Sequence, residues 1–159
     1  MIEVVTELST ELATLMIPLQ KSNLLLPNAA VAEIIPYEPL RRVQDTPDWF
    51  LGFLAWRRVQ VPVASFEMLT VERASFSLVS VASANLVILR ALGAADDFSY
   101  FAVVAQMLPR LEQVGADQLF ETDEPVARTE LIKVRFGNDL VSIPDLDFIE
   151  SEIRAVAFQ

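Results

Sequence analysis

Neighbouring carboxylates are the side chains of this sequence best suited to acid–base chemistry. They occur as the pairs Asp96 and Asp97, Asp123 and Glu124, and Asp145 and Asp147. Two carboxylates hydrolyse glycosides when they face each other across a cleft, roughly 5–10 Å apart. These pairs fall instead in expected loops and at an expected helix start, where solvation and capping account for acidic residues. We therefore expect structural roles for them, and also for the acidic run at residues 121–125, which lacks the spacing of a calcium-binding loop.

Most enzymatic and metal-binding sites need residue types that this chain lacks. It has no histidine and no cysteine, which excludes a histidine general base, the usual serine or cysteine triads, disulfides and cysteine-bound metals. Its 4 glycines are far apart in the sequence, so there is no phosphate loop and no dinucleotide fingerprint. We expect no catalysis, no bound metal and no cofactor.

Two adjacent arginines interrupt the apolar stretch GFLAWRRVQVPVASFEML at residues 52–69. Neighbouring residues of a strand point to opposite faces, so either Arg57 or Arg58 should face the buried side unless the strand bulges. A buried arginine must be paired. A structural ion pair and a donor exposed to a partner protein both fit this pattern. Trp49 and Trp56 are expected to be core or interface anchors rather than a ligand-stacking pair.

The overall charge is acidic, with 12 basic and 22 acidic residues and a net charge of −10. Such a chain repels nucleic acid and anionic lipid, and the pairs Arg41-Arg42 and Arg57-Arg58 are too few to form a phosphate-binding groove. Apolar residues make up 53% of the chain, which indicates a large core, a partner interface, or both. No apolar run reaches the ~20 residues of a membrane span and the N-terminus is acidic, so we expect a cytoplasmic protein that does not insert into membranes.

Short strands separated by turn signals make up most of the chain, whose 159 residues suit one domain. Strands are predicted at residues 12–20, 23–28, 30–37, 84–92, 99–108, 131–136 and 139–143, and a helix at 144–158. Residues 52–66 are predicted to form two strands that meet near Arg57 and Arg58. Gly137 and Asn138 suit a two-residue hairpin turn. Asp45 or Thr46 is placed to cap a short helical turn that Pro47 opens. This pattern predicts an all-β protein, with either one barrel or two small fused barrels.

The segment AVAEIIPY followed by TPDWFLGFLAWRRVQVPVASFEML resembles the CheW-like family of bacterial chemosensory adaptors. The residues that fall on family positions are Val31, Glu33, Ile34, Pro47, Gly52, Arg57, Pro62 and Val63. The later segments ANLVILRAL, SYFAVVAQMLPRLEQV and GNDLVSIPDLDFIESEI are similar to the family's closing strands and helix. Arg58 stands where the family usually has glycine, and Ala64-Ser65 replaces an aliphatic residue and an aspartate. These departures are typical of a divergent branch, such as one that serves a type IV pilus (twitching-motility) system.

The resemblance implies an all-β fold: one domain over residues 1–159, made of two intertwined five-stranded SH3-like barrels with short helices and a C-terminal helix. It implies a non-catalytic adaptor that couples the cytoplasmic tip of a methyl-accepting chemoreceptor to the regulatory domain of a CheA-type histidine kinase. The implied partner-binding residues are Val31, Glu33, Gly52, Arg57 and Arg58. We expect an ion pair between Glu33 and Arg57, and one exposed patch lined by Val31, Glu33, Gly52 and Arg57.

A small-ligand-binding or carboxylate-based enzymatic β-barrel is the alternative. The region between the barrels separates the two hypotheses. An open apolar groove there favours an adaptor, whereas a closed polar pocket with converging acids favours a ligand site or an enzyme.

Overall fold

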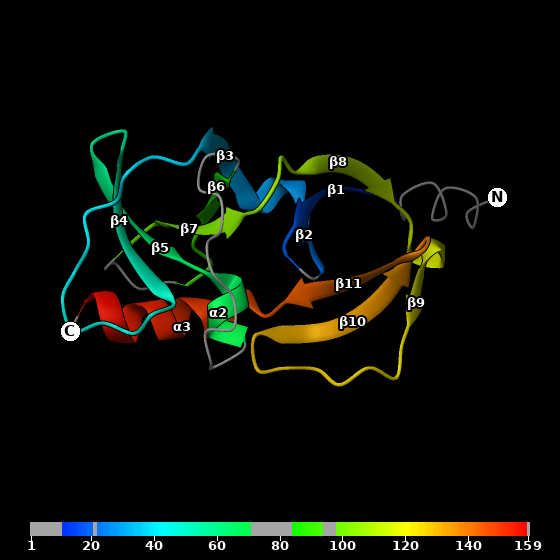
Figure 1. The fold of residues 1–159 in the computed structure, drawn as a ribbon. Coiled ribbons are helices and arrows are strands. Elements are labelled where there is room, and N and C mark those ends of the chain that lie inside the picture. The colour runs from blue at the N-terminus through cyan, green and yellow to red at the C-terminus, as the bar shows by residue number, and fades with distance from the viewer. Residues whose placement is uncertain (1–10, 21, 71–83, 94–97, 159) are drawn as a thin grey trace.

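Two β-sheets and a C-terminal helix form the computed structural model, which describes residues 11–20, 22–70, 84–93 and 98–158 (Figure 1). The first sheet contains β1 (Leu12–Pro18), β2 (Asn23–Pro27), β8 (Arg110–Val114), β9 (Leu119–Glu121), β10 (Glu130–Phe136) and β11 (Asp139–Pro144). The second sheet contains β3 (Val31–Pro36), β4 (Phe50–Trp56), β5 (Val59–Ala64), β6 (Asn85–Arg90) and β7 (Tyr100–Ala105). The described helices are α2 (Phe66–Thr70), α3 (Leu146–Ala157) and the 3₁₀ turns η1 (Asn28–Ala30) and η3 (Ala116–Gln118).

The chain passes from the first sheet to the second and back. It begins the first sheet with β1 and β2, builds the whole second sheet, and then adds β8 to β11 to the first. The strand orders are β8-β1-β2-β11-β10-β9 and β3-β6-β7-β5-β4. We call the first sheet the first barrel and the second sheet the second barrel. The all-β fold of two intertwined barrels with a C-terminal helix is confirmed, and short β9 gives the first barrel a sixth strand.

The predicted hairpins are present. Strands β1 and β2 pair in antiparallel register, and so do β10 and β11 around Gly137, whose φ is +63°. The helical turn expected near Asp45 is wrong. Asp45 has a φ of +62°, and the Phe50 N–H donates to the Pro47 carbonyl at 3.0 Å. The chain therefore makes two successive turns and enters β4 directly, leaving no residues for a helix.

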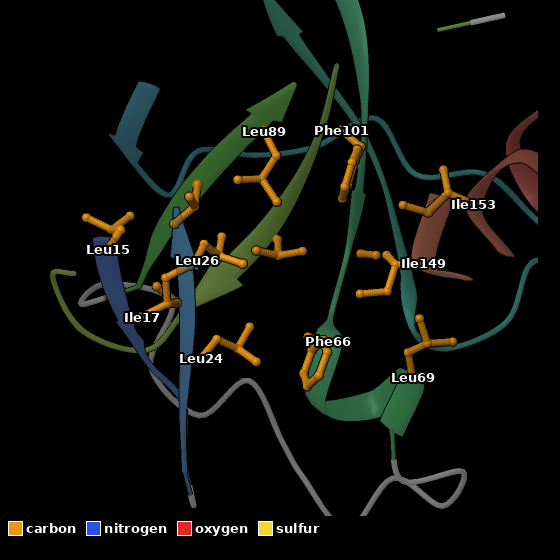
Figure 2. Packing of buried hydrophobic residues seen from close by; sticks show 14 of the residues in the cluster. Leu15, Ile17, Leu24, Leu26, Phe66, Leu69, Leu89, Phe101, Ile149 and Ile153 are labelled. Carbon is orange, nitrogen blue, oxygen red and sulfur yellow. The ribbon is translucent and has the colours of Figure 1, made fainter. Parts of the chain in front are cut away.

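Several strands bury three or more consecutive residues and therefore both of their faces, which explains their unbroken apolar runs. They are β1, β2, β4, β5, β6 and β7. In β6, Val87 and Leu89 face a core between the barrels, while Leu86 and Ile88 face the interior of the second barrel. The inter-barrel core collects side chains from both sheets and from α3 (Figure 2). Its largest members include Leu15, Ile17, Leu24, Leu26, Phe66, Leu69, Leu89, Phe101, Ile149 and Ile153. Strand β10 differs because its outer face is solvated, so its apolar residues alternate with polar ones as the sequence predicted.

Helix α3 begins where the sequence predicted. The Asp145 side chain caps it by accepting a hydrogen bond from the Phe148 N–H at 3.1 Å. Ile149 and Ile153 are buried in the inter-barrel core, so α3 returns from the first barrel to pack beside the second (Figure 1). The capping role expected for Asp145 is confirmed, while Asp96 and Asp97 lie outside the described residues.

Candidate partner-binding site

Arg57 and Arg58 form the two-residue turn between β4 and β5. Their φ angles are +48° and +67°, and positive φ at both central residues is what a type I′ hairpin turn requires. Both side chains are exposed. The expectation that one of them faces the buried side is wrong, because the strand ends at Trp56 before the arginines begin.

Glu33 joins the two edge strands of the second barrel. Its Oε1 accepts one hydrogen bond from Trp56 Nε1 at 2.8 Å and another from Arg57 Nη2 at 3.0 Å. The Arg57 guanidinium also lies 4.6 Å from the centroid of the Trp56 ring, a cation–π geometry. The predicted pairing of Glu33 with Arg57 is confirmed. The two side chains are 38% and 68% exposed, respectively, so theirs is a surface ion pair.

A bulge in β3 aims Glu33 at Trp56. Val31 pairs with Leu89 and Glu33 with Ile88, so Ala32 is an extra residue in the ladder. Such a bulge re-aims the neighbouring side chains. Arg90 holds the start of the strand, because its Nη1 donates to the carbonyls of Ala29 and Val31 at 2.8 and 2.7 Å.

Gly52 does not lie in the exposed patch where it was expected. It is buried, with a φ of +130°, and a Cβ there would lie 2.5 Å from the Arg41 carbonyl oxygen. That oxygen accepts a hydrogen bond from the Phe53 N–H at 2.9 Å, and the Arg41 N–H donates to the Phe53 carbonyl at 2.9 Å. The segment before β4 therefore covers Gly52, and the glycine is needed for this close backbone approach.

The five predicted site residues separate in space. Glu33 and Arg57 are in contact and Arg58 follows directly, all at one end of the second barrel. Val31 is half-buried against the inter-barrel core, on the other face of β3. The predicted single patch of four residues is therefore wrong, and Glu33 with Arg57 is the part of it that forms.

Sequence reasoning missed how Trp56 and Tyr100 support this site. The Trp56 ring is 8% exposed and packs edge-on against Tyr100, with ring centroids 5.0 Å apart. Its position next to Arg57 was the available sequence signal. Trp49 packs separately against the inter-barrel core, so both tryptophans are packing anchors, as expected.

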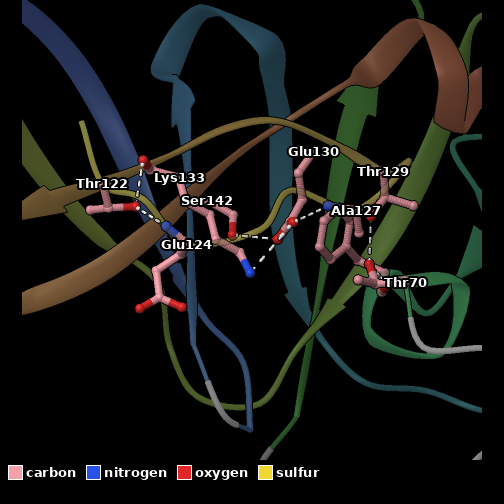
Figure 3. Close-up of polar contacts among 9 residues, drawn as sticks. Thr70, Thr122, Glu124, Ala127, Thr129, Glu130, Lys133 and Ser142 are labelled. Atoms are coloured by element: carbon pink, nitrogen blue, oxygen red, sulfur yellow. Dashed lines mark hydrogen bonds and ion pairs between the residues drawn. The ribbon is translucent and has the colours of Figure 1, made fainter.

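The polar cluster closest to catalytic chemistry is buried in the first barrel. Glu130 accepts hydrogen bonds from Ser142 Oγ at 2.6 Å and from the Ala127 N–H at 2.8 Å, and Lys133 Nζ lies 3.7 Å away (Figure 3). Ser142 is 2% exposed, so no substrate can reach it. The cluster instead fixes the loop that enters β10.

Two cavities bear on the ligand-site alternative. One of about 300 Å³ lies against the segment before β4, and Asp48 is its one carboxylate. The other, an open apolar groove of about 270 Å³ at the mouth of the first barrel, has no carboxylate among its lining residues. The space between the barrels is filled by the inter-barrel core. In the described part of the chain, no group of three or more acidic side chains is arranged to hold a metal.

Comparisons with known proteins agree with this architecture. The family model described as "CheW-like domain" matches residues 13–150. The crystal structure of the scaffolding protein TtCheW from Thermoanaerobacter tengcongensis aligns with a TM-score of 0.66 at 13% identity, covering 84% of each chain. No curated protein matches the chain in sequence. None of the helices within the described ranges is long and apolar enough to cross a bilayer.

Proposed function

The chain belongs to the CheW-like domain family, and from that membership we propose that it is a non-catalytic adaptor of a bacterial chemosensory system. The observation that carries this proposal is the family match over residues 13–150, most of the chain. The two-barrel fold shared with TtCheW, itself described as a scaffolding protein, supports it. The buried and satisfied state of Glu130 and Ser142 also favours a scaffold over an enzyme.

The proposed partners are the cytoplasmic helical tip of a chemoreceptor and the regulatory domain of a CheA-type histidine kinase. The chain would act in the cytoplasm as one domain that holds both partners at once. Such an adaptor regulates the kinase only if both contacts favour the same kinase state. The departures from the family pattern at Arg58 and at Ala64-Ser65 support assignment to a divergent branch, which we propose serves a type IV pilus system.

The proposed receptor contact is the surface around Glu33 and Arg57. Glu33 occupies one edge of the Arg57 guanidinium, and the 68% exposure of the Arg57 side chain leaves other N–H groups pointing to solvent. A planar guanidinium held in this way can donate two parallel hydrogen bonds to a partner, which lysine cannot imitate. Arg58 extends this surface within the same turn, whereas Val31 lies on the other face of β3, against the inter-barrel core. Gly52 would affect receptor binding only indirectly, through the backbone of β4.

Co-sedimentation tests this function. The probes are a purified receptor signalling fragment and a CheA-type kinase encoded in the same genome as this chain. We expect wild type to sediment with both, and Arg57→Lys to weaken receptor binding by about tenfold while kinase binding is kept.

Arg110→Lys is the matched control, because Arg110 forms another exposed ion pair, with Glu112 at 3.3 Å on the first barrel. It should bind like wild type. A wild-type chain that fails to sediment with the receptor fragment, or with the kinase, would show that the proposed function is wrong.

A further inference from the structure

We propose that Arg58 determines partner specificity. Arg58 and the solvent-exposed part of the Arg57 guanidinium bind two carboxylates that are spaced one turn apart on the partner's helix. The inference rests on the proposed function and adds to it the chemistry of the segment that docks here.

The turn keeps two arginines where local energetics favour other residues. Both Arg57 and Arg58 have positive φ, a region that Asn and Gly occupy readily and other residues occupy under strain. Such strain is concentrated at functional sites, where the identity of the side chain matters more than a low conformational energy of the backbone. The contacts of Arg57 with Glu33 and Trp56 provide a structural reason for arginine at position 57.

Arg58 has no comparable structural use. Across the described ranges it takes part in no hydrogen bond, ion pair or ring contact, and its side chain is exposed. The turn would form more easily with glycine at this position. A strained, exposed guanidinium without a partner is therefore available to a group from outside the chain.

The surroundings of the turn fit a helix that mixes apolar and acidic residues. Val59 is 39% exposed and Ala55 is exposed beside it, so apolar contacts flank the arginines. The turn lies at the periphery of the ribbon in Figure 1, at the end of the β4–β5 hairpin. Side chains three or four residues apart on a helix are about 5–6 Å apart at Cβ, so two carboxylates can meet two neighbouring guanidinium groups.

The net charge of the chain disfavours a polyanionic partner. The chain carries a net charge of −10, which repels nucleic acid and anionic membranes at long range. Glu33 also sits within 3.0 Å of Arg57 and would oppose a phosphate dianion more strongly than a single carboxylate. A partner with few, well-placed carboxylates fits these conditions best.

The test uses the receptor signalling fragment as probe and measures its Kd at 50 and 300 mM salt. We expect Arg58→Ala and Arg58→Gly each to weaken binding about tenfold at low salt, and to reduce the salt dependence. Because glycine relieves the backbone strain, Arg58→Gly separates lost binding from lost folding. Arg110→Ala, which removes an exposed arginine of the first barrel, is the control and should leave both quantities unchanged.

A double-mutant cycle identifies the group that Arg58 meets. Glutamates of the probe's helical tip are changed one at a time to glutamine, and coupling of at least one of them with Arg58→Ala is expected. If wild type binds but Arg58→Ala binds equally well, or shows no coupling to any glutamate, this inference is wrong while the proposed function stands. If wild type does not bind the fragment, the proposed function itself fails and takes this inference with it.

Discussion

At the candidate site one carboxylate oxygen accepts hydrogen bonds from two donors, of which one is buried and the other exposed. Glu33 Oε1 accepts from the nearly buried Trp56 indole at 2.8 Å and from the exposed Arg57 guanidinium at 3.0 Å. A buried donor left without a partner costs about 1–3 kcal/mol, whereas an exposed ion pair contributes about 1 kcal/mol or less. The Trp56 bond should therefore carry the stability of this contact, which leaves Arg57 available for binding.

This asymmetry predicts unequal effects of two alanine substitutions. Arg57→Ala should lower the free energy of unfolding by about 1 kcal/mol or less, and Glu33→Ala by about 2 kcal/mol, because only the second leaves the Trp56 N–H unpaired. Urea denaturation measures both values. Glu33→Gln, which keeps an oxygen acceptor for Trp56, should behave like Arg57→Ala; equal losses for Arg57→Ala and Glu33→Ala would contradict this explanation.

Arg58 should reduce the stability of the chain. Its φ of +67° costs a residue with a Cβ about 1 kcal/mol or more, and glycine is spared that cost. We expect Arg58→Gly to raise the free energy of unfolding by about 1 kcal/mol. Arg58→Ala removes the same charge but keeps the strain, so it should be close to neutral. A glycine variant no more stable than the alanine variant would show that the turn is unstrained.

At the scale of elements, the closure of the second barrel depends on Gly52. The segment that ends at Arg41 pairs with Phe53 and so covers the free edge of β4. Pairing this edge removes exposed backbone groups that could otherwise join another sheet. A side chain at position 52 would push this segment away.

Two glycines with positive φ provide a matched comparison. Gly52→Ala should cost about 3 kcal/mol, because it combines backbone strain with a Cβ placed 2.5 Å from a backbone oxygen. Gly137→Ala meets open space at a φ of +63° and should cost only about 1 kcal/mol, since strain alone acts there. Thermal denaturation of the two variants compares them. Similar losses of stability in the two variants would mean that the backbone at Arg41 moves away from the added Cβ at little cost in free energy.

Elements fixed by local chemistry were predictable, and those fixed by long-range contacts were not. The start of α3 and the β10–β11 turn follow from Asp145 and Gly137, whose effects act within a few residues. The pairing of Glu33 with Arg57 came from family positions, since no periodicity links residues 24 apart in sequence. The burial of Gly52 depends on Arg41, and no local pattern shows that approach.

At the scale of the whole molecule, buried carboxylates tie the two barrels together. Glu67 on α2 accepts a hydrogen bond from the Gln20 N–H of the first barrel at 2.6 Å and another from Gln106 Nε2, just beyond β7, at 3.0 Å. Glu150 on α3 accepts from the backbone N–H groups of Leu92 and Gly93. These bonds and the inter-barrel core join residues that are far apart in the sequence, so neither barrel has a closed surface of its own.

The chain should therefore unfold as one unit, as expected for a single domain over residues 1–159. Trp56 belongs to the core of the second barrel, whereas Trp49 packs against the inter-barrel core. In a Trp49→Phe background the fluorescence of the remaining tryptophan, Trp56, therefore reports the second barrel, while far-UV circular dichroism reports both sheets. Met16 is buried in the first barrel's own core, and Met16→Ala should cost about 2–5 kcal/mol. If the chain is a single cooperative unit, the cavity that Met16→Ala creates lowers the urea midpoint of the tryptophan fluorescence as much as that of the dichroism signal, although Met16 is distant from Trp56. Ile88→Ala, in the second barrel, is the reciprocal control. If Met16→Ala shifts the dichroism midpoint and leaves the fluorescence midpoint in place, the barrels are independent units, and coupling between a receptor and a kinase could not depend on their shared core.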